Sequence, residues 1–134
     1  RALRGRDDAH TGAVDFAGYQ PRERIAKYLA AATLVWIPVS GFVIYQAAAA
    51  RKPIVAFDVE WHSEFVEHNV TGVLVQNRNV GQLAAAVTTL LDDPVHAQGL
   101  GIRASEKFRA ENDQAMLVDQ EIREYVQVMA DGSA

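Results

Sequence analysis

Two apolar runs, each followed by a loop and then by a segment that favours a helix, limit the folds open to this chain most strongly. Leu34–Val39 and Ile54–Phe57 are apolar on both faces, as the central strands of a parallel sheet are. The first run leads through Ser40 and Gly41 into an alanine-rich segment that ends at Ala50. Strands that alternate with helices predict an α/β domain with a doubly wound, Rossmann-like parallel sheet.

The pattern along the rest of the chain predicts a lead-in over 1–13, strand–helix units over 14–79 and helices over 80–130. The expected strands are Val14–Tyr19, 34–39, 54–57 and Val73–Val75, and the expected helices between them are Arg22–Ala32, Gly41–Ala50 and a short one that ends before Asn69. Helical spacing then predicts helices over 80–91, 95–109 and 114–129, the second weakened by Gly99 and Gly101. One face of the last helix carries Leu117, Val118, Ile122, Tyr125, Val126 and Met129.

Composition and charge exclude several classes of protein. The 134 residues suffice for one domain with a real core, and the formal charge of −4 argues against a surface that binds nucleic acid. The absence of cysteine excludes a disulfide framework and a thiolate metal site. No apolar run reaches the length of a membrane span, and the basic start Arg1–Arg6 lacks the apolar core of a signal peptide. We therefore expect a cytoplasmic protein.

The turn at Ser40–Gly41 predicts an anion site. A glycine between a buried strand and a helix start lets backbone N–H groups approach a ligand, and the helix dipole favours negative charge there. That arrangement suits phosphate esters without selecting among them. A plain strand-to-helix turn with Ser40 as N-cap residue is the alternative.

The order and spacing of several short motifs resemble a known family. The motifs are Val14-Asp15-Phe16-Ala17-Gly18, Val35-Trp36-Ile37-Pro38, Ser40–Ala49, Arg51-Lys52-Pro53-Ile54-Val55-Ala56, Asp58–Glu64, Thr71-Gly72-Val73-Leu74-Val75 and Leu90-Leu91-Asp92-Asp93-Pro94. Residues 14 to about 110 thereby resemble the C-terminal, donor-binding lobe of GT-B glycosyltransferases, and within these the retaining family 4. The resemblance implies transfer of a hexose from a nucleoside-diphosphate sugar to a hydroxyl acceptor with retention and without a metal cofactor.

The resemblance also implies donor-binding residues. The N–H groups of Ser40, Gly41, Phe42 and Val43 would meet the distal phosphate or sugar, and Gly18 with Tyr19 would lie at the nucleobase. Gln46 stands where the family has the second glutamate of its Glu-x7-Glu motif, which holds the ribose. A backbone carbonyl is the alternative partner for Gln46, and a surface position is the alternative for Tyr19.

Two departures from the family pattern affect the expected activity. Pro38 occupies the position of the first glutamate, and nothing before Val14 resembles the units whose Arg and Lys clamp the donor diphosphate. The N-terminal, acceptor-binding lobe is also missing, so we expect an incomplete lobe that is inactive alone and has that lobe as its partner. Attachment to a membrane surface through the missing lobe and homo-oligomers stay open.

Two other functions remain as alternatives, a non-catalytic GT-B-like partner subunit and a GT-B-fold sugar-nucleotide epimerase. No catalytic residue is assigned. Trp61, His62 and Glu64 form a cluster that invites a general base, but in the family a glutamate here caps a short helix, and Trp61 is expected to pack. His10, His68 and His96 share no spacing typical of metal ligands.

Overall fold

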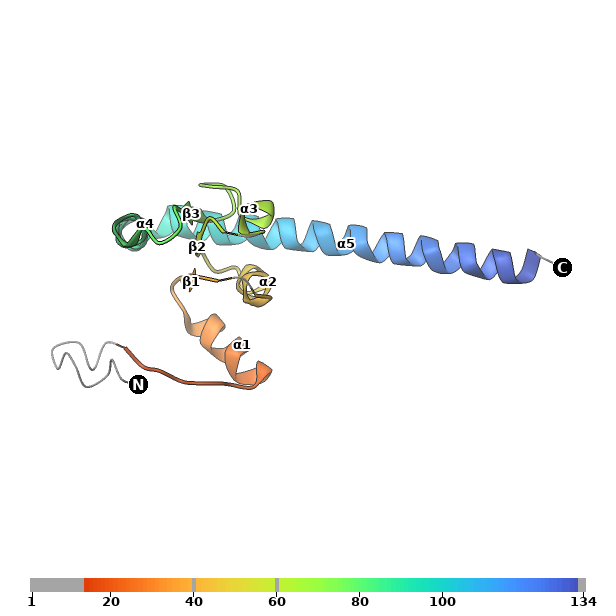
Figure 1. Ribbon diagram of the computed structural model, residues 1–134, viewed down its shortest axis with the longest axis horizontal. Coiled ribbons are helices and arrows are strands. Elements are labelled where there is room, and N and C mark those ends of the chain that lie inside the picture. The colour runs from red at the N-terminus through yellow and green to blue at the C-terminus, as the bar shows by residue number, and fades with distance from the viewer. Residues whose placement is uncertain (1–13, 40, 60, 133–134) are drawn as a thin grey trace.

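The protein folds around a small parallel sheet. A computed structural model describes residues 14–39, 41–59 and 61–132. The strands are β1 (Val35–Ile37), β2 (Ile54–Phe57) and β3 (Val73–Val75), in the order β1-β2-β3. Both pairings are parallel, with Trp36 opposite Val55 and Ala56 opposite Leu74. The α/β class and the parallel sheet predicted from the sequence are confirmed (Figure 1).

The helices follow the predicted order closely up to residue 92. They are α1 (Arg22–Ala31), α2 (Val43–Ala49), α3 (His62–Phe65), α4 (Val80–Asp92) and α5 (Pro94–Gly132). Asn69 has a φ of 60° in the turn that follows α3, where Val70 and Thr71 both donate to the carbonyl oxygen of Glu67. At the start of α4, the side chain of Asn79 accepts a hydrogen bond from the Gln82 N–H.

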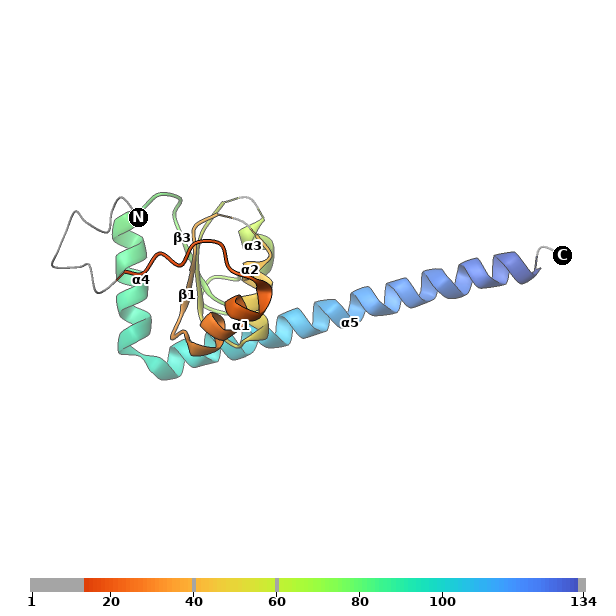
Figure 2. The same cartoon turned by 90° about the horizontal axis from the view of Figure 1, so that it is seen from below.

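Apolar layers cover both faces of the sheet, which explains why β2 is apolar throughout. Ile54 and Ala56 face a core built with α1, α2, α3 and the middle of α5, whereas Val55 faces a core built with β3, α4 and the start of α5. Neighbouring residues of a strand point to opposite faces, so a strand covered on both sides needs no polar positions. Figure 2 shows α4 on one side of the strands and α2 with α3 on the other.

The predicted strand at Val14–Tyr19 is wrong, so the sheet has three described strands and not four. Residues 14–17 are without regular structure, and Gly18 turns the chain with a φ of 70°. A strand is stabilised by hydrogen bonds to a neighbouring strand. The segment pairs with no described strand and its side chains are exposed, so its apolar alternation has no sheet to join.

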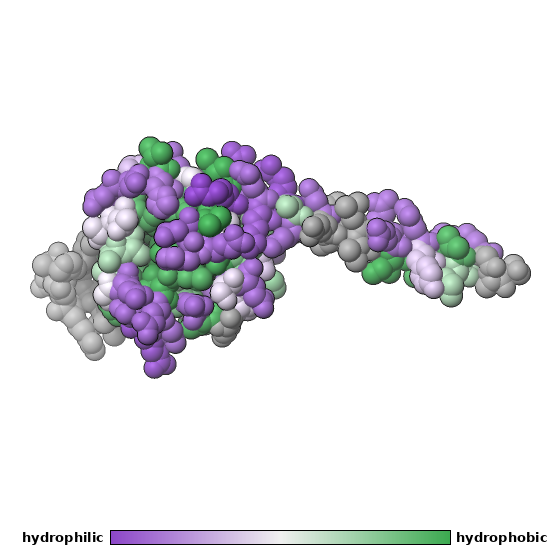
Figure 3. All heavy atoms as spheres, turned by 90° about the horizontal axis from the view of Figure 1, so that it is seen from above, coloured by the Kyte–Doolittle hydropathy of each residue, from purple (hydrophilic) through white to green (hydrophobic). Residues whose placement is uncertain are grey.

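The predicted division between helices 95–109 and 114–129 is also wrong, because α5 is one helix of 39 residues. Gly99 and Gly101 lower helix propensity, but packing against the domain compensates there. The later part of α5 extends away from the domain (Figure 2). Of the described side chains on its predicted apolar face, Ile122, Tyr125, Val126 and Met129 are each more than half exposed. Figure 3 shows small hydrophobic areas among hydrophilic ones on the projecting part of the helix.

A close contact with the loop before β2 positions α5. Gly101 is buried, and a methyl group added there would overlap the carbonyl oxygen of Arg51. Arg51 itself has a φ of 60°, and the N–H groups of Arg51 and Lys52 bond to the carbonyl oxygens of Ala48 and Ala47 at the end of α2. Glycine is therefore required at position 101 because helix and loop backbones lie in contact.

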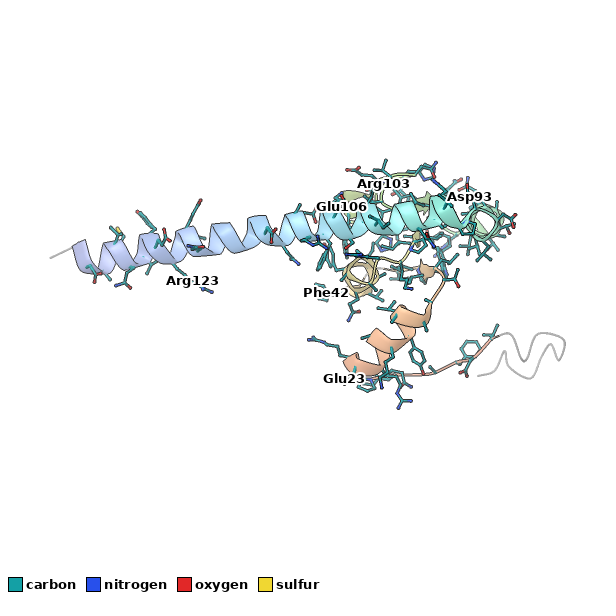
Figure 4. All side chains as sticks on the ribbon, turned by 180° about the vertical axis from the view of Figure 1, so that it is seen from behind. Glu23, Phe42, Asp93, Arg103, Glu106 and Arg123 are labelled. Atoms are coloured by element: carbon teal, nitrogen blue, oxygen red, sulfur yellow. The ribbon has the colours of Figure 1, made fainter. Side chains whose placement is uncertain are left out.

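Two cations of α5 hold the loop that joins α3 to β3. Arg103, labelled in Figure 4, donates from Nε to the Val70 carbonyl oxygen at 2.7 Å. Lys107 donates from Nζ to the carbonyl oxygens of Phe65 at 2.8 Å and Glu64 at 3.2 Å. Thr71 reinforces the same loop, because its Oγ1 donates to the Phe65 carbonyl and accepts from the Glu67 N–H. The position of α3 therefore depends on α5.

Replacing Gly101 and Gly99 of α5 should give effects of different size. Gly101→Ala should lower the free energy of unfolding by about 1–3 kcal/mol, because the new methyl group overlaps backbone. Gly99→Ala is the matched control. Its methyl group approaches the Arg103 guanidinium at 3.2 Å and no backbone atom, so Gly99→Ala should lower the free energy of unfolding less than Gly101→Ala does. Urea unfolding measures both, and equal effects would refute a specific contact at Gly101.

Removing the charge of Lys107 should loosen α3. Lys107→Met loses the hydrogen bonds to two carbonyl oxygens and should cost about 1–2 kcal/mol of unfolding free energy. Arg109→Met, at an exposed position of the same helix, should stay within about 0.5 kcal/mol. Hydrogen exchange should report faster exchange of the Val66 N–H, which bonds to the His62 carbonyl oxygen, in the Lys107 variant alone. Unchanged exchange of the Val66 N–H would show that Lys107 does not hold α3 in place.

Candidate donor site

The carboxyl ends of the strands carry the loops that the sequence singles out. In open parallel sheets, ligands bind outside these ends. The turn from β1 to α2 and the loop from β2 to α3 both start there, away from the amino ends at which α5 crosses beneath the sheet (Figure 2). A ligand site is therefore expected at this carboxyl edge of the sheet.

Gly41 lies in the turn from β1 to α2 with free space beside it. Among the described residues other than its chain neighbours, no atom lies within 4 Å of the position that a Cβ would take at Gly41, so these residues leave the backbone open to approach. The helix begins at Val43 with Phe42 as N-cap residue, which makes no side-chain capping bond. Ser40 lies outside the described residues.

The first turn of α2 has backbone donors without a partner among the described residues. The earliest donors of this turn that bond within the described chain are Ile44, to the Gly41 carbonyl at 3.4 Å, and Tyr45, to that of Phe42 at 3.0 Å. Among described residues, no bond engages the N–H groups of Phe42 and Val43. Such donors can accept an anion as their partner.

Gln46 faces a groove of about 420 Å³ beside α2. Its lining comes from α1, α2 and α5 and consists of Arg22, Phe42, Tyr45, Gln46, Ala49 and Phe108. Gln46 is half-buried, and its side chain has no hydrogen bond within the described part of the chain. A neighbouring carbonyl, the alternative partner, is therefore not observed there. Phe42, 81% exposed, projects from α2 at the same groove (Figure 4).

Gly18 and Tyr19 precede α1 and do not line this groove. Tyr19 is 97% exposed, and Gly18 is exposed as well. The chain then reaches Arg22, the first residue of α1, which does line it. The structure thus brings Phe42 and Gln46 together in one groove and leaves the predicted nucleobase residues outside it.

The cluster after β2 is a packing unit. His62 is fully buried, its Nδ1 lies 2.7 Å from the Phe57 carbonyl oxygen, and its Nε2 has no partner among the described residues. A ring buried in this way cannot reach a substrate as general base. Trp61 stacks on Tyr45 with ring centroids 5.4 Å apart, as packing predicts. Glu64 is exposed, and the side chain of Trp61, the N-cap residue of α3, makes no capping bond.

A second groove, of about 380 Å³, lies between the outer edge of β3 and α4. Two of its side chains accept hydrogen bonds from the backbone. His68 Nδ1 accepts from the Leu74 N–H at 3.1 Å, and Gln82 Oε1 accepts from the Gln76 N–H at 2.8 Å. Exposed strand edges invite pairing with other chains, so these side chains serve to close the edge.

The described ranges, 14–39, 41–59 and 61–132, contain neither a cluster of metal ligands nor a membrane-spanning helix. No group of three or more His, Asp or Glu side chains there is arranged to hold a metal ion. Within the same ranges, no helix is both long enough and apolar enough to cross a membrane.

Sequence reasoning missed Arg22, Tyr45 and Phe108. Tyr45 lies three residues after Phe42, so helical spacing could have placed it on the same side of α2. Arg22 and Phe108 come from helices distant in sequence, and no local signal brings them to the groove.

Comparison with known families identifies the chain's relatives. The family described as "Glycosyl transferases group 1" matches residues 1–93. A D-inositol 3-phosphate glycosyltransferase of Nocardia farcinica is 35% identical over 95 residues, which cover 68% of this chain and 21% of that protein. A glycogen synthase of Mycobacterium tuberculosis is 38% identical over 73 residues, covering 54% of this chain and 18% of that protein.

Solved structures agree with these relatives. Sucrose-phosphate synthase from Thermosynechococcus elongatus superposes with a TM-score of 0.74 and 29% identity, covering 91% of this chain and 32% of that one. Anabaena Alr3699/HepE in complex with UDP and glucose gives a TM-score of 0.71 and 27% identity, covering 85% and 32%. The chain spans 14–22% of the length of its curated relatives. It belongs to the glycosyl transferases group 1 family and has the fold of a GT-B glycosyltransferase's C-terminal lobe.

Proposed function

We propose that this chain is the donor-binding part of a retaining, family 4-like glycosyltransferase that moves a hexose from a nucleoside-diphosphate sugar to a hydroxyl acceptor without a metal ion. The observation that carries the proposal is the open turn at Gly41, at the carboxyl edge of the sheet in a chain of this family. Backbone N–H groups of Phe42 and Val43 stand there without a partner among described residues.

The chemistry asked of this turn is electrostatic. Negative charge builds on the leaving diphosphate as the glycosidic bond breaks, and N–H groups already aimed at it stabilise that charge without reorganising. The helix behind the turn has seven residues, so the local N–H groups contribute more than a long helix dipole. Gln46 would donate or accept a hydrogen bond at a ribose hydroxyl, more weakly than a carboxylate accepts one.

The relatives support a sugar nucleotide as donor. The structure of Alr3699/HepE holds UDP and glucose, and another holds UDP-glucose. A mannosyltransferase of Mycobacterium tuberculosis, 37% identical over 71 residues, is described as GDP-mannose-dependent. We propose that this chain binds the diphosphate that these donors share. The base and the sugar are to be determined by experiment.

The acceptor would bind to a second lobe. The relatives are several times longer than this chain, and the projecting part of α5 exposes Ile122, Tyr125, Val126 and Met129. A helix of this length without tertiary contacts is marginal in water, so a partner surface would stabilise it. Catalysis would then require that lobe. A non-catalytic partner subunit stays the alternative, and the sequence feature that would suit it is Gln46 and Pro38 at the two glutamate positions implied by the resemblance.

Calorimetric titration of the protein with UDP, GDP, ADP and TDP tests the proposal. One diphosphate should bind with a dissociation constant below about 1 mM, because a substrate site is tuned to such concentrations. A non-catalytic subunit that has lost the donor site should bind none of the four. Absence of binding to all of them would therefore contradict the donor-binding function.

Gly41→Val should abolish binding of that diphosphate while leaving unfolding unchanged. The side chain has room in the fold but would block the approach of a ligand to the backbone. Gly81→Val in α4 is the control, because its added side chain also meets no closer neighbour than Asn79 Oδ1 at 3.5 Å. Equal affinities of the two variants for the diphosphate would show that Gly41 is not part of the binding site.

A further inference from the structure

Arg22 places a cation in the groove that holds Gln46. It is the first residue of α1 and lines the groove with Phe42 and Tyr45 of α2 and Phe108 of α5. Its side chain is exposed, and no hydrogen bond or ion pair engages it within the described residues. The guanidinium is therefore available to a ligand in the groove.

Helix stability does not explain an arginine at this position. The start of a helix carries a partial positive charge, so a cation in the first turn is unfavourable. Arg24 lies in the same turn and does not line the groove, so the two arginines differ in what they can reach.

The other cations near the candidate site are engaged or distant. Lys107 bonds to the carbonyl oxygens of Glu64 and Phe65, and Arg103 bonds to that of Val70. Arg51 and Lys52 line a different groove, with Ala32 and Pro94, at the amino ends of the strands. Of the described cations, Arg22 is the one that lines the groove beside α2.

We infer that Arg22 binds the phosphates of the nucleotide donor, an inference that rests on the proposed function. A planar guanidinium matches two phosphate oxygens at once, which makes arginine suited to this role. Gln46 in the same groove offers an amide to a hydroxyl, and exposed Phe42 offers an aromatic face. Cation, amide and ring together suit a molecule with phosphate, ribose and base.

Two matched variants test the role of Arg22. Arg22→Gln and Arg24→Gln each remove one charge from the first turn of α1, so any effect of overall charge or helix stability is shared. Calorimetry measures the affinity of the wild type and of both variants for UDP, GDP and ADP and for uridine, guanosine and adenosine. Thermal unfolding confirms that the variants fold.

Arg22→Gln should weaken diphosphate binding by about ten-fold, and added salt should reduce the difference. Nucleoside binding should stay the same, and Arg24→Gln should change diphosphate affinity less than about two-fold. Equal diphosphate affinities of the two variants would overturn the role of Arg22 while leaving the donor site at Gly41 intact. An equal loss of nucleoside affinity in Arg22→Gln would also overturn it, because Arg22 would then shape the groove and not bind phosphate. A wild type that binds no diphosphate refutes the proposed function and this inference with it.

Discussion

The contact between Gly101 of α5 and the carbonyl group of Arg51 determines the arrangement of the rest of the domain. It brings α5 against the loop that ends α2 and begins β2. From that point, α5 continues along the face covered by α2 and α3, where Ala104 and Phe108 join the core. Arg103 and Lys107 then reach the loop after α3. One face of one helix thus positions the elements on both sides of β2.

The two edges of the sheet therefore have different roles. The amino edge is closed by backbone contact with α5, so substitutions there act on stability. Among the described residues, the carboxyl edge has the glycine turn and a helix start whose N-cap residue makes no side-chain bond, and the groove beside α2 holds an amide, an arginine and the exposed ring of Phe42. Loops held by a rigid scaffold are where binding groups concentrate, and this division places the proposed donor site on the free edge.

The sequence predicts the elements whose neighbours lie inside the chain. β2 and β3 begin and end where their apolar runs do, because each is packed on both sides by described elements. Val14–Tyr19 has alternating apolar residues but no described strand beside it, so the local pattern alone does not establish a strand. Gly101 shows the opposite case. Its sequence pattern predicts a weakened helix, whereas in the structure the glycine allows α5 to pack closely on the loop at Arg51. The approach of Arg22 and Phe108 to Gln46 is a tertiary contact that spacing does not encode.

Amide chemical-shift mapping, with a nucleoside diphosphate added to the isotopically labelled protein, tests the central claim most directly. The claim is that backbone N–H groups of the turn between β1 and α2 bind the donor's diphosphate. It predicts the largest shifts at Gly41, Phe42 and Val43, with further shifts at the Gln46 side chain. Shifts confined to the groove beside β3 and α4, or their absence throughout, would contradict it.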